Sequence, residues 1–326
     1  MSSPLHLGLE PHFAALESFL AEQEASFEPE VRPMVREVLA HPGKRLRPLL
    51  AFGSGAGIGP SIDLVRGAAI VELVHLATLV HDDVLDGADT RHGADTPNHT
   101  HGAHAAVLFG DALFAHALVL ASEHTSSTLC SIVARASRDV CSGEVCQTFS
   151  RGHDDLSLED YYRHIRLKTA ELFRVSCFLG ARLAGFEGGY VEAVSRFGRH
   201  LGIAYQIYDD LLDFFGEEAR VGKTLGTDLA SGKLTLPLLI LLERLSADER
   251  TTLTAELAGG SPPQPLLRLG QMRELGVFAA VSQAVEAEIA AAIGALRAWP
   301  DAPPTPLLLG LCDVLHAQVA SVRPSG

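Results

Sequence analysis

The stretch LVRGAAIVELVHLATLVHDDVLD, residues 64–86, is a long apolar run that ends in a cluster of aspartates. Its apolar side chains recur at spacings of three and four residues, the repeat of one face of an α-helix. The same repeat recurs in four further stretches, residues 103–121, 162–183, 197–215 and 276–299. Alternating runs rich in Val, Ile and Thr, which would predict strands, are missing. The pattern therefore predicts a mostly α-helical fold.

Turn-forming residues interrupt the helical pattern at several places, but only one break is typical of a linker. It is Gly259-Gly260-Ser261-Pro262-Pro263, and the helical repeat resumes directly after it. We therefore expect one domain over residues 1–326, in which a motif-bearing core at 43–237 is followed by a C-terminal helical part at 238–326.

Composition excludes several classes of protein. The 326 residues are 47% hydrophobic and 20% charged, which is incompatible with a disordered chain. With 26 Lys and Arg against 40 Asp and Glu, the net charge of −14 argues against a nucleic-acid partner. The five cysteines have no C-x-x-C spacing, so neither a disulfide framework nor a zinc site is indicated.

Targeting and membrane signals are also weak. Residues 1–10 lack the pattern of a signal peptide, and charges interrupt the apolar runs before they could span a bilayer. We expect a cytoplasmic protein without an integral membrane segment.

Two aspartate clusters are the sharpest chemical signal. Asp82-Asp83-Val84-Leu85-Asp86 and Asp209-Asp210-Leu211-Leu212-Asp213 both read D-D-x-x-D, and each lies in an apolar helical stretch. Residues four apart on a helix lie on one face, about 6 Å apart along the axis. One such cluster is more often a solvated helix end, but two favour metal binding, because like charges in apolar surroundings need a cation. Oxygen-only ligands favour Mg²⁺, which takes its remaining oxygens from water and substrate phosphates.

Several basic residues lie in distinctive short sequence motifs, although the chain as a whole is acidic. Gly43-Lys44-Arg45-Leu46-Arg47-Pro48 combines arginines, which bind phosphate with two hydrogen bonds, and a lysine point charge, so it predicts a diphosphate clamp at a helix start. Gly222-Lys223-Thr224 is similar to the end of a Walker A loop. However, the glycine required five residues earlier is Glu217 and no strand precedes it, so we exclude an ATPase.

Taken together, these frames resemble the trans-isoprenyl diphosphate synthases, the polyprenyl synthetase family. The resemblance extends in order from about Gly43 to Pro237. It implies an all-α, isoprenoid-synthase-type bundle of about ten or more helices around a deep central cavity, usually a homodimer, with the two aspartate clusters on facing helices. Further matching frames are Glu72-Leu73-Val74-His75, Phe109-Gly110-Asp111-Ala112-Leu113, Gly143-Glu144 with Gln147, and Phe197-Gly198 leading to Tyr205-Gln206-Ile207.

The resemblance also implies a reaction. An allylic diphosphate loses its diphosphate with the help of three Mg²⁺ ions, isopentenyl diphosphate attacks the resulting carbocation, and the released diphosphate takes the proton. The implied metal ligands are Asp82, Asp86 and Asp209, supported by Asp83, Asp210 and Asp213. The implied contacts of the allylic diphosphate are Arg91, Lys168, Thr169, Gln206, Lys223 and Lys233, and those of isopentenyl diphosphate are Lys44, Arg47 and His75. The catalytic set is Asp82, Asp83, Asp86, Arg91, Lys168, Asp209 and Lys223.

One position departs from the family pattern. Arg91-His92-Gly93 stands where the family usually has Arg-Arg-Gly, and the second arginine normally binds isopentenyl diphosphate. A histidine carries charge only when protonated, and its ordinary pKa is about 6.5. We therefore place His92 in the substrate-binding set and expect weakened use of isopentenyl diphosphate that improves as the pH falls toward that value.

Product length in the family depends on bulk one helical turn before the first cluster. Here Ala77 and Thr78 occupy that turn, and both are small. The resemblance therefore implies an open path for the growing chain and a long product of C30 or above, with C15–C20 as the alternative.

Two other functions are compatible with the same fold. A terpene synthase would consume an allylic diphosphate alone, but Lys44, Arg47 and His75 would then have no role. A non-catalytic subunit of a heteromeric synthase usually lacks aspartates in one cluster, whereas both clusters are complete here. A prenyltransferase remains the favoured interpretation.

Overall fold

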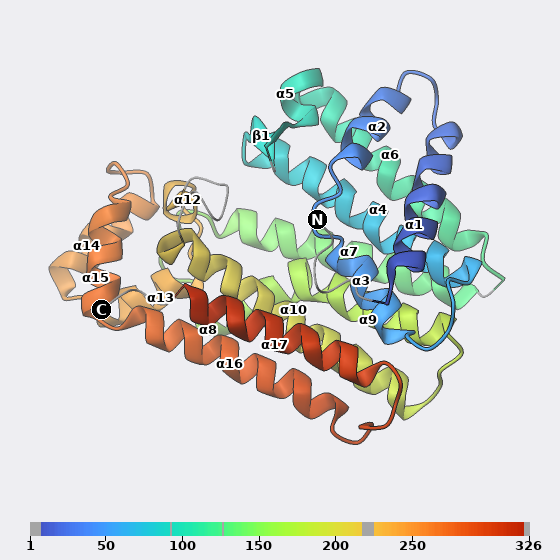
Figure 1. Ribbon diagram of the computed structural model, residues 1–326. Coiled ribbons are helices and arrows are strands. Elements are labelled where there is room, and N and C mark those ends of the chain that lie inside the picture. The colour runs from blue at the N-terminus through green and yellow to red at the C-terminus, as the bar shows by residue number, and fades with distance from the viewer. Residues whose placement is uncertain (1–7, 92, 126, 217–224, 323–326) are drawn as a thin grey trace. The chain divides into compact units, whose positions relative to one another are not determined.

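The computed structural model describes residues 8–91, 93–125, 127–216 and 225–322, and these residues are almost entirely helical (Figure 1). The strands within them are the two-residue β1 (Thr90–Arg91) and β2 (Ala94–Asp95), which pair antiparallel with Thr90 opposite Asp95. The prediction of an all-α fold is confirmed.

The helices follow one another with short connections. In the first half of the chain they are α1 (Glu10–Gln23), the 3₁₀ turn η2 (Glu24–Ser26), α2 (Arg32–Ala40), α3 (Leu46–Ser54), α4 (Ile62–Leu85), α5 (Pro97–His101), α6 (Ala103–Ser122) and α7 (Ser127–Phe149). In the second half they are α8 (Leu158–Ile165), the π-helical segment η3 (Arg166–Ala170), α9 (Glu171–Leu183), α10 (Gly189–Phe215), α12 (Thr227–Ala230), α13 (Leu236–Arg244), α14 (Ala247–Leu257), α15 (Pro265–Glu274), α16 (Val277–Leu296) and α17 (Thr305–Ser321).

The chain divides into two compact units, each assembled from separate segments. The first unit comprises Met1–Arg138, Leu172–Gly198 and Ala295–Leu311. The second comprises Asp139–Glu171, Arg199–Gly294 and Cys312–Gly326. The first aspartate cluster belongs to the first unit and the second cluster to the second unit. One domain over residues 1–326 stays a prediction.

Helix α4 is the central helix of the first unit. Ser61 caps its start by accepting a hydrogen bond from the Leu64 amide, 3.3 Å away. Its side chains are buried on nearly all sides from Leu64 to Val80, as expected of a helix that is apolar all round. This burial holds helix α4 in place. Because α4 ends directly before Asp86, the first aspartate cluster lies on a rigid support.

Helices α3 and α9 approach each other closely at Gly180. A Cβ atom at this position would lie 2.0 Å from the Ala51 carbonyl oxygen, a contact that no side chain can make. The backbone of α3 could not move away without disturbing the packing of its buried neighbours, because Leu49, Leu50 and Phe52 are almost completely inaccessible.

Gly180→Ala should therefore destabilise the protein by about 1–3 kcal/mol, the usual cost of overpacking. The free energy of unfolding, measured by urea denaturation, checks this. The matched control is Gly294→Ala in α16, where an added Cβ meets nothing within 4 Å. This control should leave stability unchanged or raise it by up to about 1 kcal/mol. Equal stabilities of the two variants would contradict the steric argument.

In the second unit, a buried ion pair joins α14 to α15. Arg268, 1% exposed, binds the Glu256 carboxylate through two nitrogens, with Nη2 2.5 Å from Oε1 and Nε 3.3 Å from Oε2. Helix α14 begins with a capping box in which Ser246 and Glu249 exchange hydrogen bonds. Helix α15 starts at Pro265, soon after the break at residues 259–263.

Two described helices, α6 and α16, are long and apolar enough to cross a membrane by length and composition alone. In α6 the expected interruption by charge consists of Asp111 alone. Such helices are weak evidence for a membrane span, because core helices of soluble proteins pass the same test. In α6 the window is 39% buried, so part of its apolar surface is covered within the first unit.

Candidate active site

The first aspartate cluster lies at the carboxyl end of α4. Asp82 is half-buried, Asp86 is exposed and caps the helix, and its amide donates to the Asp82 carbonyl at 2.8 Å. A helix carries partial negative charge at this end, so carboxylates here are unfavourable unless a cation is near. A bound cation would therefore stabilise the two accessible carboxylates.

Asp83 differs from Asp82 and Asp86 in its burial, because its side chain is only 3% exposed. Arg91 donates to its Oδ1 from both Nε and Nη2, each at 2.7 Å. Burial raises the pKa of Asp83 above its ordinary value, and the charge of Arg91 opposes that rise. Arg91, expected to contact the allylic diphosphate, therefore ties β1 to the end of α4.

The basic segment before α3 is held by a residue whose role the sequence analysis missed. Arg45 has a left-handed backbone (φ 47°), is 5% exposed and pairs with Glu72 of α4 through Nη1 and Oε1 at 2.9 Å. Burial opposes the charge of Arg45, but Glu72 and then Glu17 outweigh that effect and raise its pKa. The ion pair anchors the segment to α4, three residues before His75.

The three residues expected to bind isopentenyl diphosphate all lie in the first unit. Lys44 is exposed in the loop, while Arg47 lies in the first turn of α3 with its guanidinium 5.4 Å from the Phe173 ring centre. His75 is half-buried on α4. The Arg45–Glu72 pair thus connects the elements that carry Lys44, Arg47 and His75.

The second aspartate cluster lies near the end of α10 and shows the same division by burial. Asp209 is half-buried, whereas Asp210 and Asp213 are 5% and 1% exposed. Asp213 accepts hydrogen bonds from the hydroxyl and amide of Thr227, at 2.7 and 3.3 Å, and from the Asp228 amide at 3.0 Å. Asp213 therefore holds the start of α12.

Asp210 accepts two hydrogen bonds from side chains of the second unit. Gln206 donates Nε2 to Oδ1 at 2.8 Å, and the buried Tyr161 hydroxyl donates to Oδ2 at 2.6 Å. Burial, reinforced by the charge of Asp210, holds the pKa of Tyr161 well above its usual range, so its hydroxyl stays protonated. Sequence reasoning missed Tyr161, because nothing in its local frame marks it.

Lys168 and Thr169 lie in the π-helical segment η3, a distortion that is frequent at functional sites. The Lys168 ammonium forms an ion pair with Glu144 and lies 3.0 Å from Gln147 Oε1. The Thr169 hydroxyl donates to Gln206 Oε1 at 2.6 Å. Helix α7 approaches η3 closely at Gly143, where a Cβ would lie 2.5 Å from the Lys168 amide nitrogen.

Lys233 is half-buried directly after α12, and its amide donates to the Asp228 carbonyl at 2.8 Å. The other two predicted substrate-binding residues, His92 and Lys223, lie outside the described residues. The described members of the set therefore form two groups. Lys44, Arg47, His75 and Arg91 lie in the first unit, and Lys168, Thr169, Gln206 and Lys233 lie in the second.

The two predicted chain-length residues differ in accessibility. Ala77 is fully buried, whereas Thr78 is half-buried and its hydroxyl donates to the His75 carbonyl at 2.6 Å. Thr78 thus shares partial exposure with Asp82, one helical turn further along α4. A bulky side chain would fit more easily at Thr78 than at Ala77.

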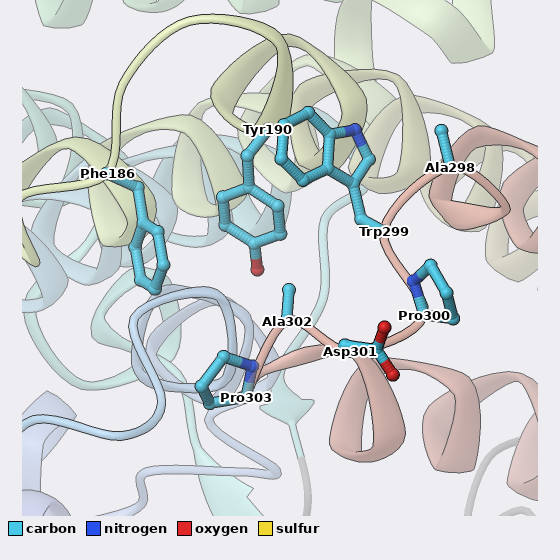
Figure 2. A pocket seen from close by; sticks show the side chains of 8 residues that line it. All are labelled: Phe186, Tyr190, Ala298, Trp299, Pro300, Asp301, Ala302 and Pro303. Atoms are coloured by element: carbon cyan, nitrogen blue, oxygen red, sulfur yellow. The ribbon is translucent and has the colours of Figure 1, made fainter.

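A pocket of about 320 Å³ opens elsewhere in the first unit (Figure 2). Tyr190 lies between Phe186 and Trp299, and its ring meets that of Trp299 edge to face at 5.7 Å. None of the predicted site residues lines this pocket. Its lining consists of Phe186, Tyr190, Ala298, Trp299, Pro300, Asp301, Ala302 and Pro303.

The donor set fits magnesium. Among the described residues, no group of three or more His, Cys, Asp or Glu side chains is gathered into a preformed metal site. Mg²⁺ does not require one, because it is usually held by one or two carboxylates and completes its shell with water and substrate phosphate. Asp82, Asp86 and Asp209 are the accessible members of the two clusters, and Asp83, Asp210 and Asp213 are the buried ones.

An all-α fold that presents acidic clusters and basic side chains suited to diphosphates defines a class of diphosphate-binding enzymes. The chain belongs to the polyprenyl synthetase family, whose sequence pattern matches residues 28–264. It is thus a prenyltransferase of isoprenoid synthesis, and the resemblance seen in its motifs is confirmed.

Individual relatives support this membership. The octaprenyl diphosphate synthase of Escherichia coli (strain K12) is 33% identical over 276 residues, which are 83% of this chain and 85% of the relative. Geranylgeranyl diphosphate synthases are also among the relatives.

Solved structures agree over nearly the whole chain. The crystal structure of a decaprenyl diphosphate synthase from Rhodobacter capsulatus matches with a TM-score of 0.90 and 32% identity, covering 98% of this chain and 99% of that one. A polyprenyl synthase from Caulobacter crescentus CB15, complexed with calcium and isoprenyl diphosphate, matches with a TM-score of 0.89 and 32% identity, covering 96% of both chains.

Proposed function

We propose that the protein joins isopentenyl diphosphate head-to-tail to an allylic diphosphate and makes a trans-polyprenyl diphosphate of C30 or above. The observation that carries this proposal is the division of both aspartate clusters into accessible and buried carboxylates. Each cluster retains at least one accessible carboxylate for a cation, Asp82 and Asp86 in the first and Asp209 in the second. A non-catalytic subunit would not need an accessible carboxylate in either cluster.

We propose that three Mg²⁺ ions are held by Asp82, Asp86 and Asp209, with Asp83, Asp210 and Asp213 supporting them through the contacts described above. When bound, magnesium supplies positive charge that stabilises the diphosphate as a leaving group. The calcium and isoprenyl diphosphate in the Caulobacter crescentus enzyme support a divalent cation at sites of this family.

The chain's own cations then bind and orient the two substrates. Lys168, Thr169, Gln206, Lys233, Arg91 and Lys223 hold the allylic diphosphate, and Lys44, Arg47 and His75, with His92, hold isopentenyl diphosphate. Fixed donors of this kind favour the charge that develops as the allylic C–O bond breaks, because they need no reorganisation at that moment. The double bond of isopentenyl diphosphate attacks the allylic carbon, and the proton released from the adduct passes to the departed diphosphate.

The decisive experiment is mass spectrometry of the products that the pure protein makes from isopentenyl diphosphate with Mg²⁺ and C5, C10, C15 or C20 allylic diphosphates, each in a separate reaction. A ladder that ends at C30 or beyond supports the proposal. A stop at C15 or C20 favours the alternative, to which the geranylgeranyl diphosphate synthases among the relatives point. Consumption of allylic substrate alone would instead indicate a terpene synthase, and no product would indicate a non-catalytic subunit.

Product length should depend on the turn of α4 before Asp82. Thr78→Phe places a ring about one helical turn, roughly 6 Å, before Asp82, a length comparable to one isoprene unit, so products should shorten to C20 or below. The product ladder of the variant, compared with the wild type, checks this. Thr78→Ser is the size-matched control and should leave the ladder unchanged. An unaltered ladder in Thr78→Phe would place the limit on another element.

We further propose a cytoplasmic homodimer whose 326 residues fold as one domain. Exposed apolar side chains on α6 support self-association: Val107, Leu108 and Val119 are 41%, 69% and 50% exposed. Leu108 and Val119 are about three helical turns apart and so lie on one face. Sedimentation velocity, with a mass twice that of the 34.7 kDa chain as the expected result, tests the dimer.

A further inference from the structure

A continuous chain of three hydrogen bonds connects α8, α10 and η3 within the second unit. Tyr161 donates to Asp210 Oδ2 at 2.6 Å, Gln206 donates to Asp210 Oδ1 at 2.8 Å, and Thr169 donates to Gln206 Oε1 at 2.6 Å. Tyr161, Asp210 and Thr169 are 3%, 5% and 9% exposed. Bonds this short and this well shielded from water are expected to be strong.

The carboxylate of Asp210 sets the direction of every bond in this chain. Its two oxygens accept hydrogen bonds from the Tyr161 hydroxyl and from the Gln206 amide nitrogen. The Gln206 carbonyl then necessarily faces Thr169, whose hydroxyl hydrogen it accepts. Thr169 thus donates its one hydroxyl hydrogen within the protein, whereas the second Nε2 hydrogen of Gln206 can point to a further acceptor such as a phosphate oxygen.

We propose that Tyr161 is a positioning residue for the allylic diphosphate, acting through Asp210 on Gln206, whose second amide hydrogen would donate to that diphosphate. This rests on the proposed function, in which Gln206 and Thr169 contact that diphosphate. Tyr161 is buried and its hydroxyl is used by Asp210, so its role in this proposal is indirect. Without its hydroxyl, Asp210 Oδ2 loses a short donor, the carboxylate can rotate, and Gln206 and Thr169 lose their fixed geometry.

Tyr161→Phe tests the role, because it removes the hydroxyl and keeps the ring. We expect the KM for the allylic diphosphate to rise about tenfold, since a hydrogen bond to a charged group is lost. The KM for isopentenyl diphosphate should stay unchanged, because Lys44, Arg47 and His75 lie in the first unit. A purely structural role would reduce the fraction of active enzyme and leave both KM values unaltered.

The matched control is Tyr162→Phe. Tyr162 is the next residue on α8, is half-buried, and packs its ring edge to face against that of Tyr161 at 5.5 Å. It is not a member of the hydrogen-bond chain, so its variant should keep both KM values. An equal change in the allylic KM of the two variants would overturn the proposal.

A double-mutant cycle tests the route. If Tyr161 acts through Gln206, then Tyr161→Phe should add little to the allylic KM once Gln206→Leu has removed the amide donor. Independent, fully additive effects would overturn the route through Gln206.

Calorimetric titration with inorganic diphosphate and Mg²⁺ separates this proposal from the proposed function. About tenfold weaker binding by Tyr161→Phe supports the positioning role, even if the wild type elongates no chain. Failure of the wild type to elongate would refute only the proposed function. Unchanged binding and an unchanged allylic KM in a variant with a wild-type unfolding midpoint would refute the positioning role.

Discussion

Asp82→Asn should lower kcat at saturating substrates by about 10²–10³-fold, the loss that follows removal of one group stabilising transition-state charge. Asparagine preserves the size of the side chain and removes its negative charge, so the Mg²⁺ proposed at the end of α4 would lose a ligand. The concentration of Mg²⁺ needed for half-maximal rate should rise as well. Asp209→Asn should behave in the same way, because Asp209 is the half-buried carboxylate of the second cluster.

Steady-state rates across a Mg²⁺ titration check this prediction. Asp63→Asn is a suitable control, because Asp63 lies in the first turn of the same helix, about 28 Å from Asp82 along the axis. Its side chain is 52% exposed, and the variant should keep the wild-type rate. If Asp82→Asn retained more than a tenth of the wild-type kcat, Asp82 would not be a metal ligand.

Glu72→Ala should lower the free energy of unfolding by about 3–5 kcal/mol, the usual result of removing one partner from a buried ion pair. The side chains of Arg45 and Glu72 are 4% and 2% exposed. Arg45 would keep its contact with Glu17 at 3.2 Å, but its buried Nη1 would lose the nearest carboxylate. Urea denaturation monitored by circular dichroism measures the effect.

Glu17→Ala is the matched control because it removes the other partner of the same arginine. The Glu17 side chain is 46% exposed, so this variant should lose no more than about 1 kcal/mol. The double variant Arg45→Met/Glu72→Met, with no unpaired charge, should be much more stable than Glu72→Ala. Similar losses in Glu17→Ala and Glu72→Ala would show that burial of the pair does not decide its contribution.

Several helices could be predicted closely from the spacing of apolar residues. The stretches 103–121 and 276–299 correspond to α6 (Ala103–Ser122) and α16 (Val277–Leu296). The stretch 162–183 was less simple, because it contains the end of α8, the π-helical segment η3 and α9. Apolar spacing does not reveal a one-residue change of helical register, so the distortion that carries Lys168 and Thr169 was not predicted.

Two residues of the candidate site were misread or missed for a common reason. Arg45 was part of a basic segment that suggested phosphate binding, but its guanidinium forms a buried ion pair with Glu72, 27 residues away. Tyr161 lies 49 residues from Asp210, its hydrogen-bond partner. Local sequence frames describe neighbours within a helical turn or two, and such distant partners become visible only in three dimensions.

The sequence alone determined the helical class, the two D-D-x-x-D clusters and the family, because these depend on residue types at fixed short spacings along a helix. Only the tertiary structure decided which aspartates remain accessible. Asp82 and Asp209 are half-buried and Asp86 is exposed, while Asp83, Asp210 and Asp213 are buried. The physical reason is that a carboxylate's burial and partners are set by the elements packed around it, which the four-residue spacing of the motif does not specify.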